Sequence, residues 1–280
     1  MGGGPRYHAA MDPKPLTQIA IYGAAGRMGQ AIIAAASAMP EMMVAAAMVR
    51  AQSNWLEQPV AGLSDGRGEP LLYASALDPD LAVQVLIDFS AGAAFDNALA
   101  IAVQRRLAFV SGTTGLDPGQ LHALQQAAKH IPLLWSANFS LGVALLQRLV
   151  TTAARSLGPE FVAEIVDAHH QQKTDAPSGT ALVLGRAIAA ARGDTFDLVA
   201  KRGRDGQIGA RPPAEIGFSS IRGGDIVGEH TVLFIAPGER IELCHRAYSR
   251  DLFARGALRA AQWLCGQPAG RYRMEDLIAD

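Results

Sequence analysis

Short apolar runs alternate with amphipathic stretches through the first half of the chain. Gln18–Tyr22 and Met42–Val49 read as strands, with a helical run at Met28–Met39 between them. Val83–Phe89 is continuously apolar, as is typical of a strand buried in a parallel sheet. Strands that alternate with helices predict an α/β fold, a doubly wound parallel sheet of Rossmann type. The other elements expected here are helices at 93–104 and 118–129, strands at 107–111 and 131–135, and a loop at 51–70.

The pattern changes after Ser140. A long helix is expected at 141–157, and three further strands follow a polar loop at 192–213. A sheet with helices on one face predicts a second domain, of the α+β class, with a mixed or antiparallel sheet. The remaining predictions are a strand at 161–168, a helix at 181–191, antiparallel strands at 216–221, 226–235 and 240–247, and a last helix at 252–264.

These patterns predict three parts of the chain. Residues 16–140 and 251–280 are expected to form a dinucleotide-binding domain. Residues 141–250 are expected to form a domain for substrate binding and oligomerisation. Residues 1–15 contain Gly2-Gly3-Gly4-Pro5 and are expected to be a flexible extension.

Composition narrows the class of protein further. The chain has 280 residues, of which 49% are hydrophobic and 18% charged, as in globular proteins with an ample core. A formal net charge of −1 favours neither nucleic acid nor an anionic membrane surface as a partner. Two cysteines exclude a disulfide scaffold, and a cytoplasmic location is expected. No apolar run reaches the length of a membrane span.

A glycine-rich turn joins the first strand to the first helix. In Gly23-x-x-Gly26-x-x-Gly29, glycine allows positive φ angles and close backbone approach, while the helix N-terminus attracts phosphate groups. A tight turn without a ligand is the alternative. The candidate cofactor-binding residues in this turn are Gly23, Ala24, Ala25, Gly26, Arg27 and Met28.

The end of the second strand bears on the choice of cofactor. An acidic residue there would bind the ribose hydroxyls and repel a 2′-phosphate, but this chain has Val49 followed by Arg50. Arg50, with Arg27, is expected to pair with a 2′-phosphate, which favours NADPH over NADH. The alternative is that Arg50 is merely a solvated residue at the strand end.

A second candidate site lies between residues 168 and 181. His169, His170 and Lys173 come shortly before the turn Ser178-Gly179-Thr180, which opens an Ala/Leu-rich helix. Free N–H groups at a helix start attract anions, and histidine and lysine bind or protonate them. The segment therefore has the makings of a site for a small carboxylate. The alternative is a solvated polar loop; a metal site is disfavoured because no third ligand has suitable spacing.

Several motifs follow one another in order along the chain. They are Gly23-Ala24-Ala25-Gly26-Arg27-Met28-Gly29, Ile87-Asp88-Phe89-Ser90, Gly112-Thr113-Thr114-Gly115, Ala137-Asn138-Phe139-Ser140, the segment 168–181 and Arg222-Gly223-Gly224-Asp225-Ile226-Val227-Gly228-Glu229-His230. Together they make the chain similar to the dihydrodipicolinate reductase family, over about residues 19–277. The departure from that pattern is Val49, where many relatives have an acidic residue.

The resemblance implies NAD(P)H-dependent reduction of dehydrated 4-hydroxy-tetrahydrodipicolinate, a cyclic dicarboxylate, to tetrahydrodipicolinate in lysine and diaminopimelate synthesis. It implies a homotetramer. The alternatives are another two-domain reductase of amino-acid metabolism and a nucleotide-binding regulator without catalysis. By resemblance, the catalytic residues are His169 and Lys173, the substrate contacts are His170, Lys173, Gly179 and Thr180, and further cofactor contacts are Gly112, Thr113, Thr114, Ser136, Ala137, Asn138 and Phe139.

Overall fold

The structure is a computed structural model that describes residues 16–65 and 68–278, so the expected extension at 1–15 lies outside the described residues. Backbone proximity divides the chain into two compact units. Unit 1 comprises the described residues up to Leu133 together with Ala261–Arg271. Unit 2 comprises Leu134–Ala260 and the described residues from Tyr272 onward. The predicted functional division into 16–140 with 251–280 and 141–250 stays a prediction.

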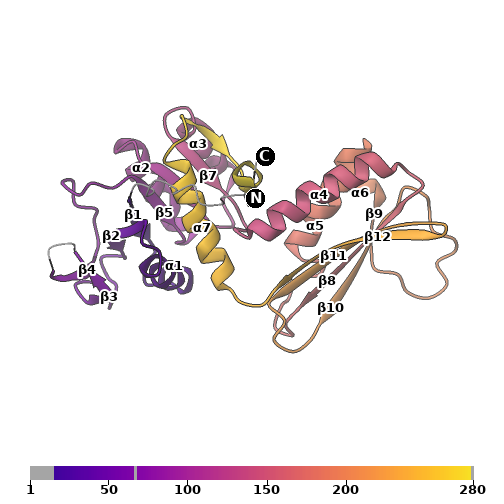
Figure 1. Ribbon diagram of the computed structural model, residues 1–280, viewed down its shortest axis with the longest axis horizontal. Helices are drawn as coiled ribbons and strands as arrows, with labels where there is room; N and C mark the ends of the chain where they lie inside the picture. Colours follow the sequence, from indigo (N-terminus) through magenta and orange to yellow (C-terminus); the bar gives the residue numbers. More distant parts are fainter. Residues whose placement is uncertain (1–15, 66–67, 279–280) are drawn as a thin grey trace, which may run out of the picture. The chain divides into compact units, whose positions relative to one another are not determined.

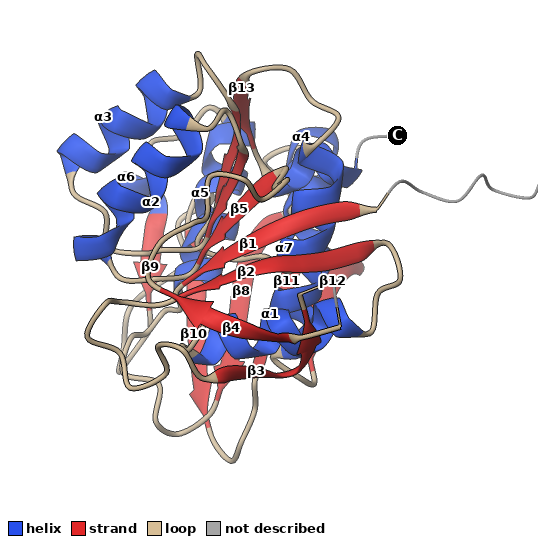
Figure 2. Ribbon diagram, turned by 90° about the vertical axis from the view of Figure 1, so that its left-hand side faces the viewer, coloured by secondary structure: helices blue, strands red, loops and turns tan. Residues whose placement is uncertain are grey.

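The first sheet has eight strands in the order β13-β7-β6-β5-β1-β2-β4-β3, and its central strands lie side by side in Figure 2. Strand β1 (Thr17–Tyr22) pairs in parallel with β2 (Met42–Met48) on one side and with β5 (Val85–Asp88) on the other. Helices α1, α2 and α3 follow β1, β5 and β6. The remaining bounds are α1 (Arg27–Ser37), β3 (Pro59–Ser64), β4 (Pro70–Ala74), α2 (Gly92–Gln104), β6 (Ala108–Ser111), α3 (Pro118–Ala127), β7 (Pro132–Trp135) and β13 (Gly270–Tyr272).

The core of unit 1 explains why its strands read as continuous apolar runs. Ile19, Ile21, Leu86 and Ile87 are all fully buried, although neighbours within a strand point to opposite faces. Both faces of these central strands are therefore covered, as in doubly wound parallel sheets. The α/β class with a mostly parallel Rossmann-like sheet is confirmed.

The second sheet has five strands in the order β12-β11-β8-β10-β9, with helices α4 and α5 packed against it (Figure 1). Their facing side chains form one apolar core with Ile165, Phe218, Val232 and Phe234 of the sheet. The bounds are α4 (Leu141–Leu157), β8 (Val162–His169), α5 (Gly179–Arg192), α6 (Phe196–Val199), β9 (Ala200–Arg202), β10 (Ile216–Arg222), β11 (Gly228–Ala236), β12 (Glu239–Ala247), α7 (Asp251–Leu264) and a 3₁₀ turn at Met274–Ile278.

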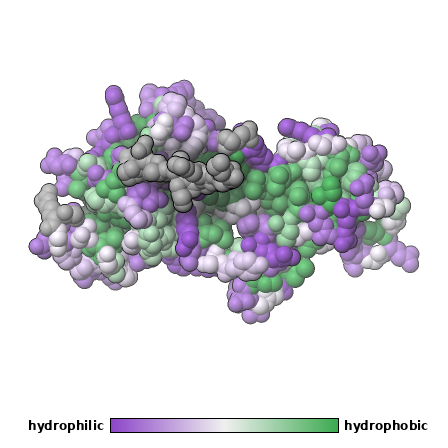
Figure 3. All heavy atoms as spheres, viewed as in Figure 1, coloured by the Kyte–Doolittle hydropathy of each residue, from purple (hydrophilic) through white to green (hydrophobic). Residues whose placement is uncertain are grey.

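Two helices of unit 2 begin at serine caps. Ser140 accepts a hydrogen bond from the N–H of Val143 at the start of α4, and Ser178 accepts one from Ala181 at the start of α5. Figure 3 shows apolar side chains over α4, where Leu145 and Leu149 are exposed. None of the described helices is long and apolar enough to span a membrane.

Three local predictions were wrong. The expected loop at 51–70 contains β3, which pairs with β4 as an antiparallel hairpin. Only Val60 of β3 is buried, so the strand lacks an apolar alternation that could reveal it. The expected loop at 192–213 contains α6 and β9, which are too short to show a period.

The third error concerns the direction of β10. It was expected to be antiparallel, but it pairs in parallel with both β8 and β9, while β11 is antiparallel to β8 and β12. The chain crosses from β8 through α5 before it reaches β10, and such a helical crossover joins parallel strands. The second sheet is therefore mixed.

Candidate active site

The glycine-rich turn lies at the carboxyl end of β1, and its close packing requires glycine, which has no side chain. Gly23 has a φ of +82°, and a Cβ there would lie 2.9 Å from the carbonyl oxygen of Phe89. A Cβ on Gly29 would lie 2.4 Å from the carbonyl oxygen of Gly23. The turn therefore packs tightly on its neighbours and leaves the N-terminus of α1 facing the edge where the parallel strands end, a geometry suited to phosphate groups.

A buried carboxylate organises the loops after the next two strands. Asp88, at the end of β5, is fully buried and accepts hydrogen bonds from the backbone N–H and hydroxyl of Ser90. Its other oxygen accepts from the hydroxyls of Ser111 and Thr113, each at 2.8 Å. The hydroxyl of Thr113 thus donates its proton to Asp88, whereas Thr114 is exposed. This network holds the Gly112–Thr114 loop in place.

The side chains predicted to choose the cofactor lie at the surface of unit 1. Arg50 is exposed and follows the end of β2. Arg27 is also exposed, at the first position of α1. Both side chains are therefore accessible to a ligand in solution.

In unit 2, one face of the sheet changes from apolar to polar at the same level on three strands. On β8, the buried row runs from Ala163 and Ile165 to Asp167 and His169. Phe218 and Val232 are paired with Ile165, and the next level pairs Asp167 with Ser220 of β10 and His230 of β11. The serine cap of α5 lies at this polar level, because Ser178 bonds both Asp167 and His230.

Asp167 is the centre of this polar cluster and is 1% exposed. One carboxylate oxygen accepts from Ser220 Oγ at 2.7 Å and from the Ser178 N–H at 3.3 Å. The other lies 2.9 Å from an Arg222 guanidinium nitrogen and 3.0 Å from His169 Nδ1. Burial raises the pKa of Asp167, but these hydrogen bonds and the charge of Arg222 outweigh it and leave the pKa below its usual value.

His169 is 8% exposed, at the end of β8. Burial lowers its pKa, the carboxylate of Asp167 acts in the opposite direction, and the charges of Lys173 and Arg222 lower it further. The net result is a pKa below the usual value for histidine. In its protonated form, an imidazole with a lowered pKa is a stronger proton donor than an ordinary histidine, which suits proton transfer.

His230 is a member of the cluster whose ring is uncharged near neutral pH. Its ring meets that of His169 edge to face, with centroids 5.2 Å apart. Burial lowers the pKa of His230 to about 4, and the neighbouring His169 contributes to the shift. Ser178 Oγ lies 3.1 Å from His230 Nε2 and already accepts from Ala181, so its own proton is available to the imidazole. His230 thus helps to hold the start of α5.

The loop after β8 carries the other predicted site residues. Lys173 is paired with Asp175 at 2.6 Å on the partly exposed side of the loop. The backbone N–H of His170 donates to Ile226, and its buried Nδ1 has no partner among the described residues. Gly179 is exposed at the first position of α5, where backbone N–H groups have no partner within the helix. Lysine and free N–H groups together suit a carboxylate ligand.

A second loop meets the start of α5. Asn138 Nδ2 donates to Thr180 Oγ1 at 3.2 Å, and Asn138 Oδ1 accepts from the N–H of Ser140. The structure therefore brings the predicted loop at 136–139 to the predicted substrate turn. Ala137 is exposed and Phe139 is buried, so the ring of Phe139 is a packing group and its predicted cofactor contact would be made by the backbone.

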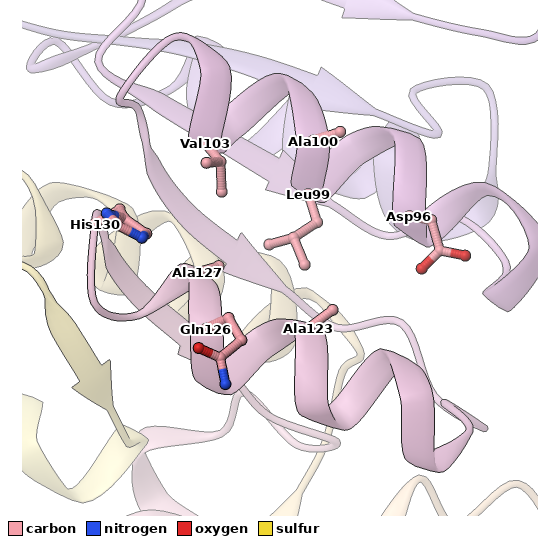
Figure 4. A pocket seen from close by; sticks show the side chains of 8 residues that line it. All are labelled: Asp96, Leu99, Ala100, Val103, Ala123, Gln126, Ala127 and His130. Carbon is pink, nitrogen blue, oxygen red and sulfur yellow. The ribbon is translucent and has the colours of Figure 1, made fainter.

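A groove of about 470 Å³ in unit 1 has no such chemistry (Figure 4). It runs between α2 and α3, and its walls are mostly apolar, with Asp96 near one end and His130 near the other. Nothing in the groove pairs a proton donor with an anion-binding group. Within the described ranges, no three histidine, cysteine or acidic side chains gather as a metal site requires.

Comparison with known proteins identifies the family of the chain. The family models "Dihydrodipicolinate reductase, N-terminus" and "Dihydrodipicolinate reductase, C-terminus" match residues 17–139 and 142–278. The chain belongs to the dihydrodipicolinate reductase family. It is 47% identical over 264 residues to the 4-hydroxy-tetrahydrodipicolinate reductase of Methylocella silvestris, covering 93% of this chain and 96% of that protein. The enzyme of that name from Ruegeria pomeroyi is 47% identical over 263 residues, 93% of this chain and 97% of that protein.

Solved structures show the same fold. A dipicolinate-bound dihydrodipicolinate reductase from Paenisporosarcina sp. TG-14 matches with a TM-score of 0.72 and 24% identity, over 93% of this chain and 99% of that one. An engineered D-amino acid dehydrogenase bound to NADP⁺ matches with a TM-score of 0.52 and 16% identity, over 94% and 96%. Both likenesses concern the fold alone.

Sequence reasoning assigned no role to several members of the polar cluster. They were Asp167, Ser220, Arg222 and His230, of which the last two stand in a motif that marks the dihydrodipicolinate reductase family; for Ser178 only its place in the turn that opens the helix was predicted. The signal that was missed is the two-residue period of the strands. Polar residues extend the inward-facing apolar rows in Ala163-x-Ile165-x-Asp167-x-His169 and His230-x-Val232-x-Phe234. Polar residues in a row that otherwise faces a core indicate a built site.

Proposed function

We propose that this chain catalyses the NAD(P)H-dependent reduction of dehydrated 4-hydroxy-tetrahydrodipicolinate to tetrahydrodipicolinate, a step of lysine and diaminopimelate synthesis. The observation that carries the proposal is the polar level of unit 2, where His169 and Lys173 lie beside the start of α5. Membership of the dihydrodipicolinate reductase family supports this substrate. An inactive regulator would have no need to keep His169 in a buried, hydrogen-bonded position.

The bound nicotinamide cofactor supplies a hydride to the substrate ring. The Gly23–Met28 turn fits the pyrophosphate of such a cofactor, because the turn leaves no room for a Cβ at Gly23 or Gly29 and presents the N-terminus of α1. The loops at 112–114 and 136–139 would position the nicotinamide and its ribose. Arg50 would pair with a 2′-phosphate, so NADPH is the preferred cofactor and NADH remains usable.

The substrate domain would bind the two carboxylates and deliver the proton. The N–H groups of Gly179 and Thr180 at the start of α5 would hold one carboxylate, and His170 and Lys173 would contact the substrate beside them. His169 would act as the acid/base residue, with Lys173 as its partner in proton donation. The active form is proposed to be a cytoplasmic homotetramer assembled through the second domain.

An absorbance assay at the nicotinamide band tests the reaction, with the substrate made in situ from its precursors. The wild-type protein should oxidise NADPH only when the substrate is present. Oxidation with a different amino-acid-derived substrate would favour another two-domain reductase, and cofactor binding without turnover would favour a regulator.

The substrate site has its own structural test. Crystals grown with cofactor and pyridine-2,6-dicarboxylate should show a carboxylate of the inhibitor on the N–H groups of Gly179 and Thr180. An inhibitor bound away from this turn would contradict the assignment while leaving the reaction itself untouched.

A further inference from the structure

Resting on the proposed function, we propose that Asp167 is a positioning residue for His169. It holds the imidazole in the tautomer with hydrogen on Nδ1, so that Nε2 is the atom that exchanges a proton with the substrate. The residues assigned above are expected to touch ligands. Asp167 is 1% exposed and both of its oxygens accept from protein groups, so its effect on the reaction passes through His169.

The first step of the argument is the ionisation of Asp167. Its carboxylate faces the charged guanidinium of Arg222 at 2.9 Å and accepts from Ser220 and Ser178 on the other oxygen. Its pKa lies below the usual value. An ionised carboxylate only accepts hydrogen bonds, so His169 Nδ1, at 3.0 Å, carries a hydrogen in both protonation states of the ring.

The second step is the fate of Nε2. Once Nδ1 is committed to Asp167, the ring gains and loses its proton at Nε2. Gly228 lies against this atom, and a Cβ at position 228 would lie 3.2 Å from it. Glycine therefore keeps the space beside Nε2 open, and the cluster fixes one nitrogen while it leaves the other accessible.

The third step is the balance of the transfer. The Nε2–H bond of the imidazolium breaks, the proton joins the substrate, and the neutral ring remains with its Nδ1–H on Asp167. The hydride comes from the nicotinamide, so the cofactor is oxidised and the substrate reduced by two electrons. Asp167 stays ionised throughout and stabilises the imidazolium by its charge.

The wild-type protein permits a direct test without activity. Two-bond ¹H–¹⁵N spectra of labelled histidine should show His169 as the Nδ1–H tautomer at high pH. A His169 ring with its hydrogen on Nε2 would overturn the proposal, and this holds whether or not the protein reduces the proposed substrate.

Asp167→Asn gives the second test. The groups facing His169 are Asp167 on its own strand, Lys173 in the following loop, Arg222 on β10 and His230 on β11. Of these, Asp167 favours the charged ring, so the substitution should move the NMR titration of His169 to lower pH. A loosened imidazole should lower kcat by about 10²-fold, as displacements of about 1 Å do, with little change in KM for the cofactor. Asp167→Glu, which restores a carboxylate, should recover part of the loss.

A matched control lies on the same strand. Glu164 is also paired with arginines, Arg204 at 2.7 Å and Arg211 at 3.0 Å, but it does not touch His169. Glu164→Gln should leave the His169 titration and the pH profile of kcat unchanged. If Asp167→Asn lowers only the thermal stability, as Glu164→Gln would, Asp167 is merely structural and the proposal is wrong.

A third variant tests the proposal even if Asp167→Asn does not fold. Gly228→Ala would crowd Nε2 without touching Asp167, so turnover should fall while the Nδ1–H tautomer persists. Unchanged turnover would mean that Nε2 is not the atom that exchanges the proton.

Discussion

Each unit contains a buried aspartate at the carboxyl end of a strand, and the two differ in what surrounds them. Asp88 accepts from the hydroxyls of Ser90, Ser111 and Thr113, which are neutral. Asp167 accepts from Arg222 and His169, which carry or exchange charge. The first arrangement holds loops in place, whereas the second also adjusts the proton affinity of a neighbour. Burial alone therefore does not distinguish a structural carboxylate from one that takes part in proton chemistry. The groups that donate hydrogen bonds to the carboxylate make this distinction.

The largest expected effect is a loss of turnover without a loss of cofactor affinity. Lys173→Ala removes the cation proposed to take part in proton donation and should lower turnover by about 10²–10⁴-fold, the usual contribution of a positioned proton donor. NADPH affinity, measured by fluorescence titration, should stay nearly the same because Lys173 is not among the proposed cofactor contacts. Turnover equal to that of the wild type would remove Lys173 from the mechanism.

The next effect tests the neutral network of unit 1. Asp88→Ala would leave several buried donors without an acceptor, and each such group costs about 1–3 kcal/mol. We expect the free energy of unfolding in urea to fall by about 3 kcal/mol and KM for NADPH to rise.

Asp88→Asn sharpens the same comparison. Its amide oxygen still accepts from hydroxyls, so it should recover part of the stability. Replacing the charged carboxylate by an amide should therefore lower turnover less at Asp88 than at Asp167. Equal damage at both positions would contradict the distinction between them.

The third prediction concerns pH and His230. The pKa of His230 is about 4 in the folded protein, against 6.5 for the free side chain. Between these values the unfolded chain binds more protons, so the stability present above pH 6.5 is lost as the pH falls toward 4. At pH 5 the loss attributable to His230 should be about 2 kcal/mol.

Urea denaturation at several pH values measures this loss. Because burial also lowers the pKa values of His169 and His245, the informative quantity is the difference between wild type and His230→Gln. That difference should shrink as the pH falls. A constant difference between pH 7 and pH 4.5 would show that His230 titrates normally.

The smallest effect concerns cofactor preference. Arg50 is exposed, so salt screens its attraction for a 2′-phosphate, and we expect NADPH to bind about tenfold more tightly than NADH. Arg50→Ala should remove most of this preference and leave NADH binding unchanged. A preference for NADPH that survives the substitution would assign the discrimination to another group, with Arg27 the next candidate.

Much of the fold could be predicted from local sequence pattern, because the residues that indicate each element lie within that element. The strand–glycine turn–helix of residues 17–37 is a local motif, and two of its glycines, Gly23 and Gly29, stand where the backbone leaves no room for a Cβ atom. The parallel sheet followed from buried apolar runs. The β3–β4 hairpin was missed because β3 is an exposed strand with one buried residue.

The polar cluster of unit 2 was only partly predictable for the opposite reason. His169 and Lys173 were visible in one segment, but Asp167, Ser220 and His230 meet only through the register of three strands. That register depends on β10 being parallel to β8, which sequence reasoning had reversed. Partners that are far apart in sequence become readable once strand direction and register are known.

The central claim is that proton chemistry resides at His169 while the cofactor binds elsewhere. The most direct test is NADPH consumption, followed by absorbance with substrate made in situ, for wild type and His169→Ala at saturating NADPH. The account predicts substrate-dependent consumption by wild type and a rate lower by about 10²–10⁴-fold in the variant, with NADPH binding retained. Equal rates in the two proteins would contradict it.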